Sequence, residues 1–221
     1  PKEGKNYYTW CGALYDGGYL GQVFLNFNTD YVYYYPDYVP SQWVLNLYTS
    51  GDARYSAYFT ELQTGYAHAL TCPLLTKYFG NESFIANLIY HVSMPKPLRL
   101  AEQYLIRAEA YCAKGQYGNA NADLTALSQA RNGKSASVTA DNWVEVISDE
   151  RVKELYMEGF RLHDLKRWNK GFEREHQAYT QTEGSRKKIE AGDYRFVWPI
   201  PQNDIEAPGS EIIQNKGYAS K

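Results

Sequence analysis

The stretch "RLAEQYLIRAEAYCAKG" (residues 99–115) decides the fold class of this chain of 221 residues. Its apolar residues return every three or four positions, which is the spacing that places side chains on one face of an α-helix. Gly115 supplies the conformational freedom with which helices commonly end. We therefore predict an amphipathic helix here, with an apolar face made of Leu100, Ala101, Tyr104, Leu105, Ala108, Tyr111 and Cys112.

A second helix is predicted in "ANADLTALSQAR" (120–131), where Ala120, Leu124 and Leu127 share one side. The small residues Ala108 and Ala120 stand where two antiparallel helices could approach closely. The pattern A-x-A-Y…G-x-Y…A…L is typical of a tetratricopeptide helix pair. One such pair cannot bury its own apolar face, so we expect neighbouring elements to pack on it.

A third helical region is predicted from 142 to 168. Asn142 and Glu145 fit a capping box at its start. Gly159 interrupts the pattern and predicts a kink or a break into two helices. The apolar stripe of this region consists of Val144, Ile147, Leu155 and Tyr156.

Upstream of these helices the patterns are weaker. "GQVFLNFN" (21–28) alternates apolar and polar residues, which indicates a short strand. A short helix is predicted over 41–49, capped by Ser41, built on Val44, Leu45 and Tyr48, and ended by Gly51.

Together these patterns predict a mainly α fold with a tetratricopeptide-like helix pair and a few short β-strands near the N-terminus. We expect one compact unit in which residues 1–98 form a loop- and strand-rich segment with short helices. That segment is expected to face a ligand. Residues 99–221 are expected to form the helical region.

The composition excludes some classes of partner. A net charge of −2 gives no reason to expect nucleic acid or an acidic membrane surface. No run approaches the roughly 20 apolar residues of a membrane-spanning helix. The unusual feature is aromatic content, since 22 tyrosines and 5 tryptophans are present. The tyrosines are concentrated in the first 60 residues.

The cysteines, Cys11, Cys72 and Cys112, show no CxxC or Cys/His spacing of a metal site. Cys112 falls on the predicted apolar stripe, so we expect a buried free thiol. A disulfide between Cys11 and Cys72 is left open.

A calcium site has one weak candidate. "NFNTD" places Asn26, Asn28 and Asp30 at alternate positions, like the opening of a calcium loop. The glycine expected at position six is Tyr31, and position twelve is Asp37 in place of glutamate. One polar face of a strand explains the same residues, so no metal and no cofactor is predicted.

Catalytic signatures are absent from the sequence: there is no G-x-S-x-G, H-E-x-x-H, P-loop or G-x-G-x-x-G. The block "EGFRLHDLKRW" (158–168) concentrates charged residues and could be read as an acid–base site. We favour a structural network in which Arg161 and Asp164, three apart on a helix, pair with each other or with adjacent turns. A glycosidase would need two facing carboxylates, and nothing in the sequence singles out such a pair.

Four stretches follow one another along the chain: "RLAEQYLIRAEAY" (99–111), "ERVKELYMEGFRLHDLKRW" (150–168), "WPIPQNDI" (198–205) and "IIQNKGY" (212–218). Together they closely resemble the C-terminal half of the SusD/RagB family of outer-membrane nutrient-binding lipoproteins. Upstream of them, "GDAR" (51–54) looks like the D-x-R element of that family.

The resemblance implies a mainly α fold of tetratricopeptide-like helix pairs with long irregular loops, and a protein that is not an enzyme. Such proteins face outward from the outer membrane, cap a SusC-like TonB-dependent transporter and capture glycans or other nutrients. Members are usually longer and begin with a lipidated cysteine. The resemblance therefore predicts membrane association only through a lipid anchor outside this sequence, and a family fold whose N-terminal half is not in it.

The tyrosines are the candidates for ligand contact. In "TDYVYYYPDY" (29–38), a strand would place Tyr31, Tyr33 and Tyr35 on one face, with Tyr34 toward the core. Aromatic rings can cover the apolar C–H faces of a sugar while polar tips form hydrogen bonds. Packing of these rings under the helices is the alternative. The predicted aromatic platform comprises Tyr31, Tyr33, Tyr35, Trp10, Tyr19 and Trp43, with Asn28 and Asp30 as polar contacts.

The leading hypothesis is a non-catalytic glycan-binding protein that delivers oligosaccharide or polysaccharide ligands to a SusC-like transporter. The second is a protein–protein scaffold that uses the helix pair, with no direct sugar binding.

Overall fold

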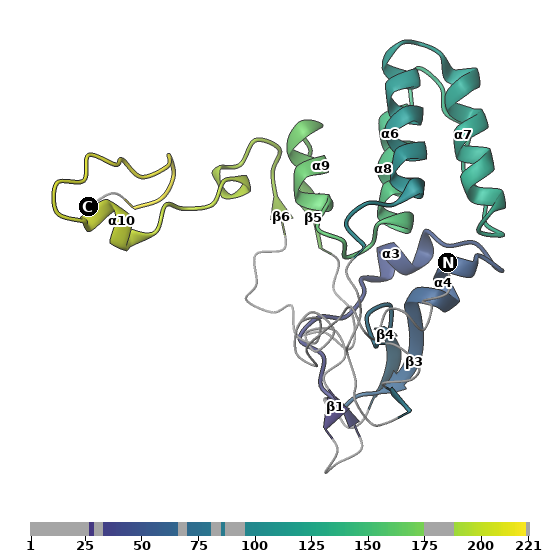
Figure 1. Ribbon diagram of the computed structural model, residues 1–221, viewed down its shortest axis with the longest axis horizontal. Helices are drawn as coiled ribbons and strands as arrows, with labels where there is room; N and C mark the ends of the chain where they lie inside the picture. Colours follow the sequence, from purple (N-terminus) through teal and green to yellow (C-terminus); the bar gives the residue numbers. More distant parts are fainter. Residues whose placement is uncertain are drawn as a thin grey trace. The chain divides into compact units, whose positions relative to one another are not determined.

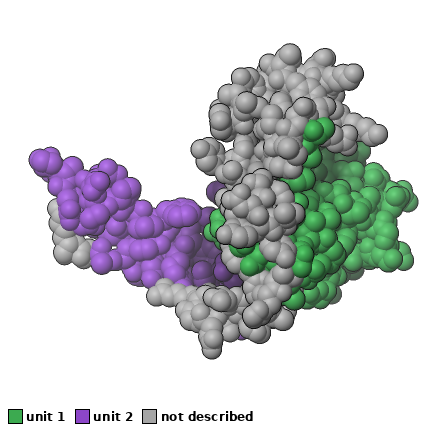
Figure 2. Space-filling view, turned by 90° about the horizontal axis from the view of Figure 1, so that it is seen from below, with its two compact units in different colours: residues 1–156, 176–181 green, residues 157–175, 182–221 purple. Residues whose placement is uncertain are grey.

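The computed structural model describes residues 27–28, 33–65, 70–80, 85–86, 96–174 and 188–219, with only the backbone of 27, 28 and 33. The chain divides into two compact units (Figure 2). Unit 1 comprises residues 1–156 and 176–181, and unit 2 comprises residues 157–175 and 182–221. The sequence predicts a boundary at residue 98 between a loop- and strand-rich segment and a helical region. The two compact units are instead divided after Tyr156, with 176–181 returning to unit 1.

The helix pair predicted from the sequence is the largest element of unit 1. Helices α6 (Leu100–Ala113) and α7 (Tyr117–Gln129) lie side by side, and α8 (Trp143–Glu154) packs on α6 (Figure 1). Ala108 and Ala120 are both fully buried, so the small residues stand where the packing is tightest. The tetratricopeptide-like pair is confirmed, and α8 supplies the neighbour that it needs.

Two details of the pair differ from the prediction. Leu100 is 74% exposed because the buried stripe runs through Ala101, Leu105, Ala108 and Cys112, which leaves Leu100 at its margin in the first turn. Helix α7 begins three residues earlier than expected. The carbonyl of Gln116 accepts bonds from the two backbone N–H groups that follow at 119 and 120, which starts the helix there.

The third helical region is broken as predicted. Helix α8 ends at Glu154 and α9 (Arg161–Arg167) begins beyond Gly159, which has a φ of +87°. The capping box, however, is wrong. The Asn142 amide instead holds the preceding loop, because its Nδ2 donates to the Ser137 carbonyl at 3.1 Å and its Oδ1 accepts from Thr139 N at 2.7 Å.

Short strands and helices form the rest of unit 1. Strand β1 (Phe27–Asn28) pairs antiparallel with β2 (Tyr33–Tyr34), and β3 (Phe59–Gln63) pairs antiparallel with β4 (Thr71–Leu75). A bridge from Tyr34 to Thr64 connects the two hairpins. The predicted strand over 21–28 is confirmed at its last two residues, and the remainder lies outside the described residues.

The predicted helix over 41–49 is present as α3 (Gln42–Asn46), shorter than expected. The Ser41 hydroxyl accepts from Val44 N at 3.4 Å, so the predicted cap is confirmed. Tyr48 packs inward, and its hydroxyl donates to the Lys153 carbonyl on α8 at 3.0 Å. Helix α4 (Ala53–Tyr58) is the next element along the chain.

The two faces of the β3–β4 hairpin have different surroundings. Leu62 pairs with Cys72, and their face carries a hydrophobic cluster. Glu61 pairs with Pro73 on the opposite face, where Thr71 also projects. The cluster consists of Cys72 and Leu74 with Tyr34, Val39, Leu62 and Phe79 packed against them.

Unit 2 is built from α9, the strand pair β5 (Phe172–Glu173) and β6 (Lys188–Ile189), η1 (Tyr194–Phe196) and α10 (Gln202–Glu206). Its last segment is held by side chains that bond to backbone. Gln214 bonds to both the N–H and the carbonyl of Ile200, each at 2.9 Å. None of the helices in the described ranges combines the length and the apolar composition that crossing a bilayer requires.

Candidate ligand-binding site

The D-x-R element positions helix α4. Asp52 caps this helix by accepting from Arg54 N at 3.0 Å, and it also binds the Arg54 guanidinium through two bonds, Nε–Oδ1 at 2.9 Å and Nη2–Oδ2 at 2.7 Å. Burial disfavours the charged form of Asp52, yet the bonds from Arg54 outweigh it, so the pKa of Asp52 lies below its ordinary value. Both side chains are only 1% exposed.

Carboxylates from α8 complete the coordination of Arg54. Its Nη1 lies 3.4 Å from Glu150 Oε2 and 3.5 Å from Glu154 Oε2. Glu154 is fully buried and also binds Arg99 and Arg131, while Glu150 is bonded to Lys153. We call these seven residues the buried charge network: Asp52, Arg54, Arg99, Arg131, Glu150, Lys153 and Glu154.

The loop after α7 closes this network. The Arg131 carbonyl accepts from Ala53 N at 2.8 Å, and the Lys134 carbonyl accepts from Lys153 Nζ at 3.1 Å. Gly133 lies so close that a Cβ added there would stand 2.5 Å from Asp52 Oδ2. The charge network therefore fixes α4 against α8, and with it the side chains on the outer face of α4.

The outer face of α4 lines an open hollow of about 370 Å³. Helices α3 and α4 and strands β3 and β4, which lie together in Figure 1, each contribute to it. We call it the α3–β4 hollow. It is lined by Gln42, Leu45, Asn46, Tyr55, Glu61, Thr71, Cys72 and Pro73.

An aromatic stack holds the ring of Tyr55 at the edge of the hollow. The centroid of that ring lies 6.0 Å from Tyr48 and 5.5 Å from Phe59. Phe59 also contacts Tyr156, whose pKa burial raises to about 12. Tyr55 itself is 37% exposed, so one part of its ring is packed and another part faces solvent.

The polar groups of the hollow have spare hydrogen-bonding capacity. Gln42 Nε2 donates to Asn46 Oδ1 at 2.8 Å, which leaves the Gln42 oxygen and the Asn46 nitrogen available. Within the described residues, the Tyr55 hydroxyl, the Glu61 carboxylate and the Thr71 hydroxyl take part in no hydrogen bond or ion pair. Such a set can bind a ligand that has several hydroxyl or amino groups.

The structure describes only part of the tyrosine-rich segment at 29–38. Tyr34 packs against the hydrophobic cluster, in agreement with its expected core position. Tyr35 is half-buried, and its ring rests on Gly65, where an added Cβ would stand 2.0 Å from a ring carbon. Tyr34 and the α3–β4 hollow thus lie against opposite faces of the hairpin.

The structure describes the other predicted ligand-contact residues to different extents. Trp43 is 39% exposed on α3, one residue from Gln42 of the hollow. Tyr33 and Asn28 are described by backbone alone, as partners in the β1–β2 pair. The other predicted contacts, Trp10, Tyr19, Tyr31 and Asp30, lie outside the described residues, so the aromatic platform stays a prediction.

Sequence reasoning missed the polar residues of the hollow. The i, i+4 spacing of Gln42 and Asn46 on the polar face of a predicted helix was an available signal. No comparable pattern marks Tyr55, Glu61 or Thr71, because each comes from a different element.

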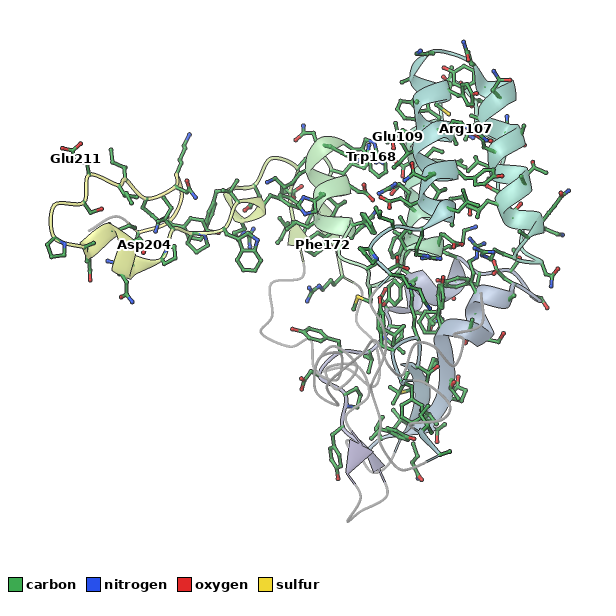
Figure 3. All side chains as sticks on the ribbon, in the orientation of Figure 1. Arg107, Glu109, Trp168, Phe172, Asp204 and Glu211 are labelled. Atoms are coloured by element: carbon green, nitrogen blue, oxygen red, sulfur yellow. The ribbon has the colours of Figure 1, made fainter. Side chains whose placement is uncertain are left out.

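The motifs singled out as alternatives have structural roles. Asp164 accepts from Arg167 Nε at 3.0 Å, and the Arg167 guanidinium stacks 4.0 Å from the centroid of Trp168, which Figure 3 labels. Cys72 and Cys112 are buried free thiols, so the disulfide left open for Cys72 is not formed. No group of three or more metal-ligating side chains occurs in the part of the chain that the structure describes. The predicted calcium ligands Asn26 and Asp30 fall outside that part.

A tetratricopeptide-like helix pair beside a β-hairpin and a polar hollow defines a mainly helical fold. The sequence model of the SusD family matches residues 5–218, and the chain therefore belongs to the SusD family. The resemblance found in the sequence is thus confirmed.

Known members of the family support this placement. The chain is 29% identical over 161 residues to the starch-binding protein SusD of Bacteroides thetaiotaomicron, which covers 72% of this chain and 28% of that protein. A SusD superfamily protein from the same organism superposes with a TM-score of 0.62 at 28% identity, over 78% of this chain and 38% of the other. A second, from Bacteroides vulgatus, gives 0.55 at 27% identity over 77% and 36%. The chain thus spans well under half the length of these relatives.

Proposed function

We propose that this protein is a non-catalytic glycan-binding component of an outer-membrane uptake system. The observation that carries the proposal is the match to the SusD family over residues 5–218, a family with a member named for starch binding. The α3–β4 hollow agrees with it. Its amide, hydroxyl and carboxylate groups are suited to sugar hydroxyls, and exposed aromatic rings are available for the apolar faces of a sugar.

The test is calorimetry of the purified protein against a panel of neutral, amino-bearing and acidic oligosaccharides. We expect affinities of about μM to mM, because polar sugars give up much of their hydration on binding. If no member of the panel produces a heat of binding in the calorimeter, glycan binding is overturned.

The non-catalytic part of the proposal has a separate test. Chromogenic glycosides incubated with the protein should release no chromophore above the rate in buffer. Turnover that is lost when a single carboxylate is changed to its amide would make the protein a glycosidase instead.

The uptake part assigns the partner and the location. We propose that the protein works at the cell surface, attached to the outer membrane as a lipoprotein, and delivers oligosaccharide to a SusC-like TonB-dependent transporter. Affinity purification from outer membranes should recover such a transporter in a fixed stoichiometry. Purification of the protein without any outer-membrane transporter, under conditions that preserve known transporter complexes, would count against this part.

A second candidate is a protein–protein scaffold without sugar binding. It is favoured by exposed apolar side chains at the start and on the outer face of α6, namely Leu98 at 85%, Leu100 at 74% and Ile106 at 46% exposure. Changing Leu100 and Ile106 together to serine should abolish capture of a protein partner if the scaffold is correct. Under the glycan-binding proposal, the same double variant should retain its affinity for sugar.

A further inference from the structure

The α3–β4 hollow carries one charged group, the carboxylate of Glu61. The other described residues that line the hollow are neutral, so none of them balances that carboxylate. Glu61 makes no ion pair with any residue in the described ranges. Its negative charge also reaches the neighbouring strand, where it adds to burial in raising the pKa of the Cys72 thiol. The hollow is thus a polar site with a negative field.

The hairpin register explains why the carboxylate faces the hollow. Glu61 lies opposite Pro73, and Gln63 lies opposite Thr71, so Glu61 and Thr71 share one face of the sheet. The helices α3 and α4 supply the other walls with Gln42, Asn46 and Tyr55. The carboxylate, the Thr71 hydroxyl and the two amides therefore converge on one volume.

The size and the chemistry of the hollow fit a small polar ring. Its volume of about 370 Å³ lies within the range of roughly 300–1,000 Å³ that is common for small-molecule sites. The Tyr55 ring is fixed by its contacts with Tyr48 and Phe59, so it can cover an apolar C–H face without first losing much side-chain entropy. The polar groups then meet the hydroxyls of the ring edge.

We propose that the α3–β4 hollow binds a sugar ring that carries no acid group, and that it prefers a ring bearing a protonated amino group. This inference rests on the proposed function and names the ligand class for one site. The amino cation of such a sugar gains an ion pair with Glu61 that a neutral hydroxyl cannot form. A uronic acid places a second carboxylate in the same field and is disfavoured.

The experiment compares three methyl glycosides with the same ring stereochemistry: glucose, glucosamine and glucuronic acid. Each is titrated into isotopically labelled protein at about pH 6, where the amino group of glucosamine is protonated and the carboxyl group of glucuronic acid is ionised. Binding is followed through the backbone amide signals of Glu61 and Thr71. We expect glucosamine to bind about two- to five-fold more tightly than glucose, and glucuronic acid to bind more weakly than glucose by a similar factor.

The substitution Glu61→Gln tests the assigned group. It keeps the shape of the side chain and removes the charge, so the ratio of the glucosamine affinity to the glucose affinity should fall to about one. Glu211→Gln is the matched control, because Glu211 is an exposed carboxylate in unit 2 and its removal should leave the ratio unchanged.

Two results would overturn the inference. The first is an unchanged order of affinities in Glu61→Gln. The second is sugar binding by calorimetry while the amide signals around the hollow stay still, which would place the binding site elsewhere and leave the proposed function standing. If the three glycosides and the whole oligosaccharide panel all fail to bind in both measurements, the proposed function itself is refuted.

Discussion

Arg54 and Tyr55 are neighbours on α4, yet their polar groups are in opposite situations. Arg54 is 1% exposed and is bonded to carboxylates of two elements, whereas the hydroxyl of Tyr55, a residue 37% exposed, is bonded to none of the described residues. A buried charge without a partner costs several kcal/mol, and each charged side chain of the buried charge network has a partner of opposite charge. Unpaired polar groups are tolerated only where water can reach them, and there they remain available to a ligand. One short helix thus separates stability from binding.

The strongest way to break this comparison is to remove the arginine. Arg54→Ala leaves Asp52 and two α8 carboxylates in a buried site without their shared cation, and we expect a loss of about 3–5 kcal/mol in the free energy of unfolding. Urea titration followed by circular dichroism measures it.

The control for that change is Arg107→Ala. Arg107 is labelled in Figure 3 and binds both carboxylate oxygens of Asp123, at 2.8 and 2.6 Å, but is 56% exposed. Water can therefore reach Asp123 once the guanidinium is removed, so the loss of stability should be clearly smaller than in Arg54→Ala. Equal losses in the two variants would show that burial does not set the value of the network.

A smaller effect is expected at Gly133. In Gly133→Ala the new Cβ would stand 2.5 Å from Asp52 Oδ2, which forces the loop away from the charge network and should cost about 1–3 kcal/mol. Gly118→Ala is the control, since Gly118 lies in the first turn of α7 and no described atom outside its own helix backbone lies within 4 Å of the added Cβ. This variant should be as stable as the wild-type protein or slightly more stable. A neutral Gly133→Ala would contradict the close approach of the loop.

Acid should destabilise the folded protein by protonating Asp52 of the buried charge network. The pKa of Asp52 is lowered in the folded state, so the stability that this carboxylate contributes is complete above its unfolded value of about 4 and is lost as the pH falls through the folded value. Unfolding in urea from pH 6 to pH 2 measures the slope.

Asp52→Asn provides the comparison for this titration. The amide cannot ionise, so the variant should be less stable near neutral pH and should lose less stability than the wild-type protein on acidification. The same loss in both proteins would show that the acid sensitivity arises from other carboxylates.

The smallest expected effect concerns the exposed side. Asn46→Ala removes one amide of the hollow and should weaken sugar affinity about two- to ten-fold while changing the free energy of unfolding by less than about 0.5 kcal/mol. Asn119→Ala is the matched control, because Asn119 is also an exposed helical amide bonded to a glutamine, here Gln116 at 3.3 Å. A stability loss without an affinity loss in Asn46→Ala would make the amide structural.

The helices were predictable because their signal is local. The spacing of Leu105, Ala108 and Cys112 defines the buried stripe of α6 within two turns, and Gly159 marks a break through its own backbone conformation. The capping role of Asn142 was wrong because the side chain of this residue had an equally local alternative, the loop at 137–139.

The hollow was not predictable because no single stretch of sequence encodes it. Glu61 and Thr71 become neighbours only through the register of the β3–β4 hairpin, and Tyr55 reaches them only because the charge network fixes α4. The partners Arg54 and Glu150 are 96 positions apart in the sequence. Long-range pairing of this kind leaves no periodic trace.

A shift in the register of the β3–β4 hairpin would affect the hydrophobic cluster and the hollow at the same time. Successive residues of a strand point to opposite faces, so inserting one residue within β3 would exchange the surroundings of Glu61 and Leu62. The carboxylate would enter the hydrophobic cluster while the leucine entered the hollow. A register shift of one residue would therefore disrupt the hollow and the hydrophobic cluster together. Selection for a stably folded chain thus also preserves the face of the hairpin that lines the hollow.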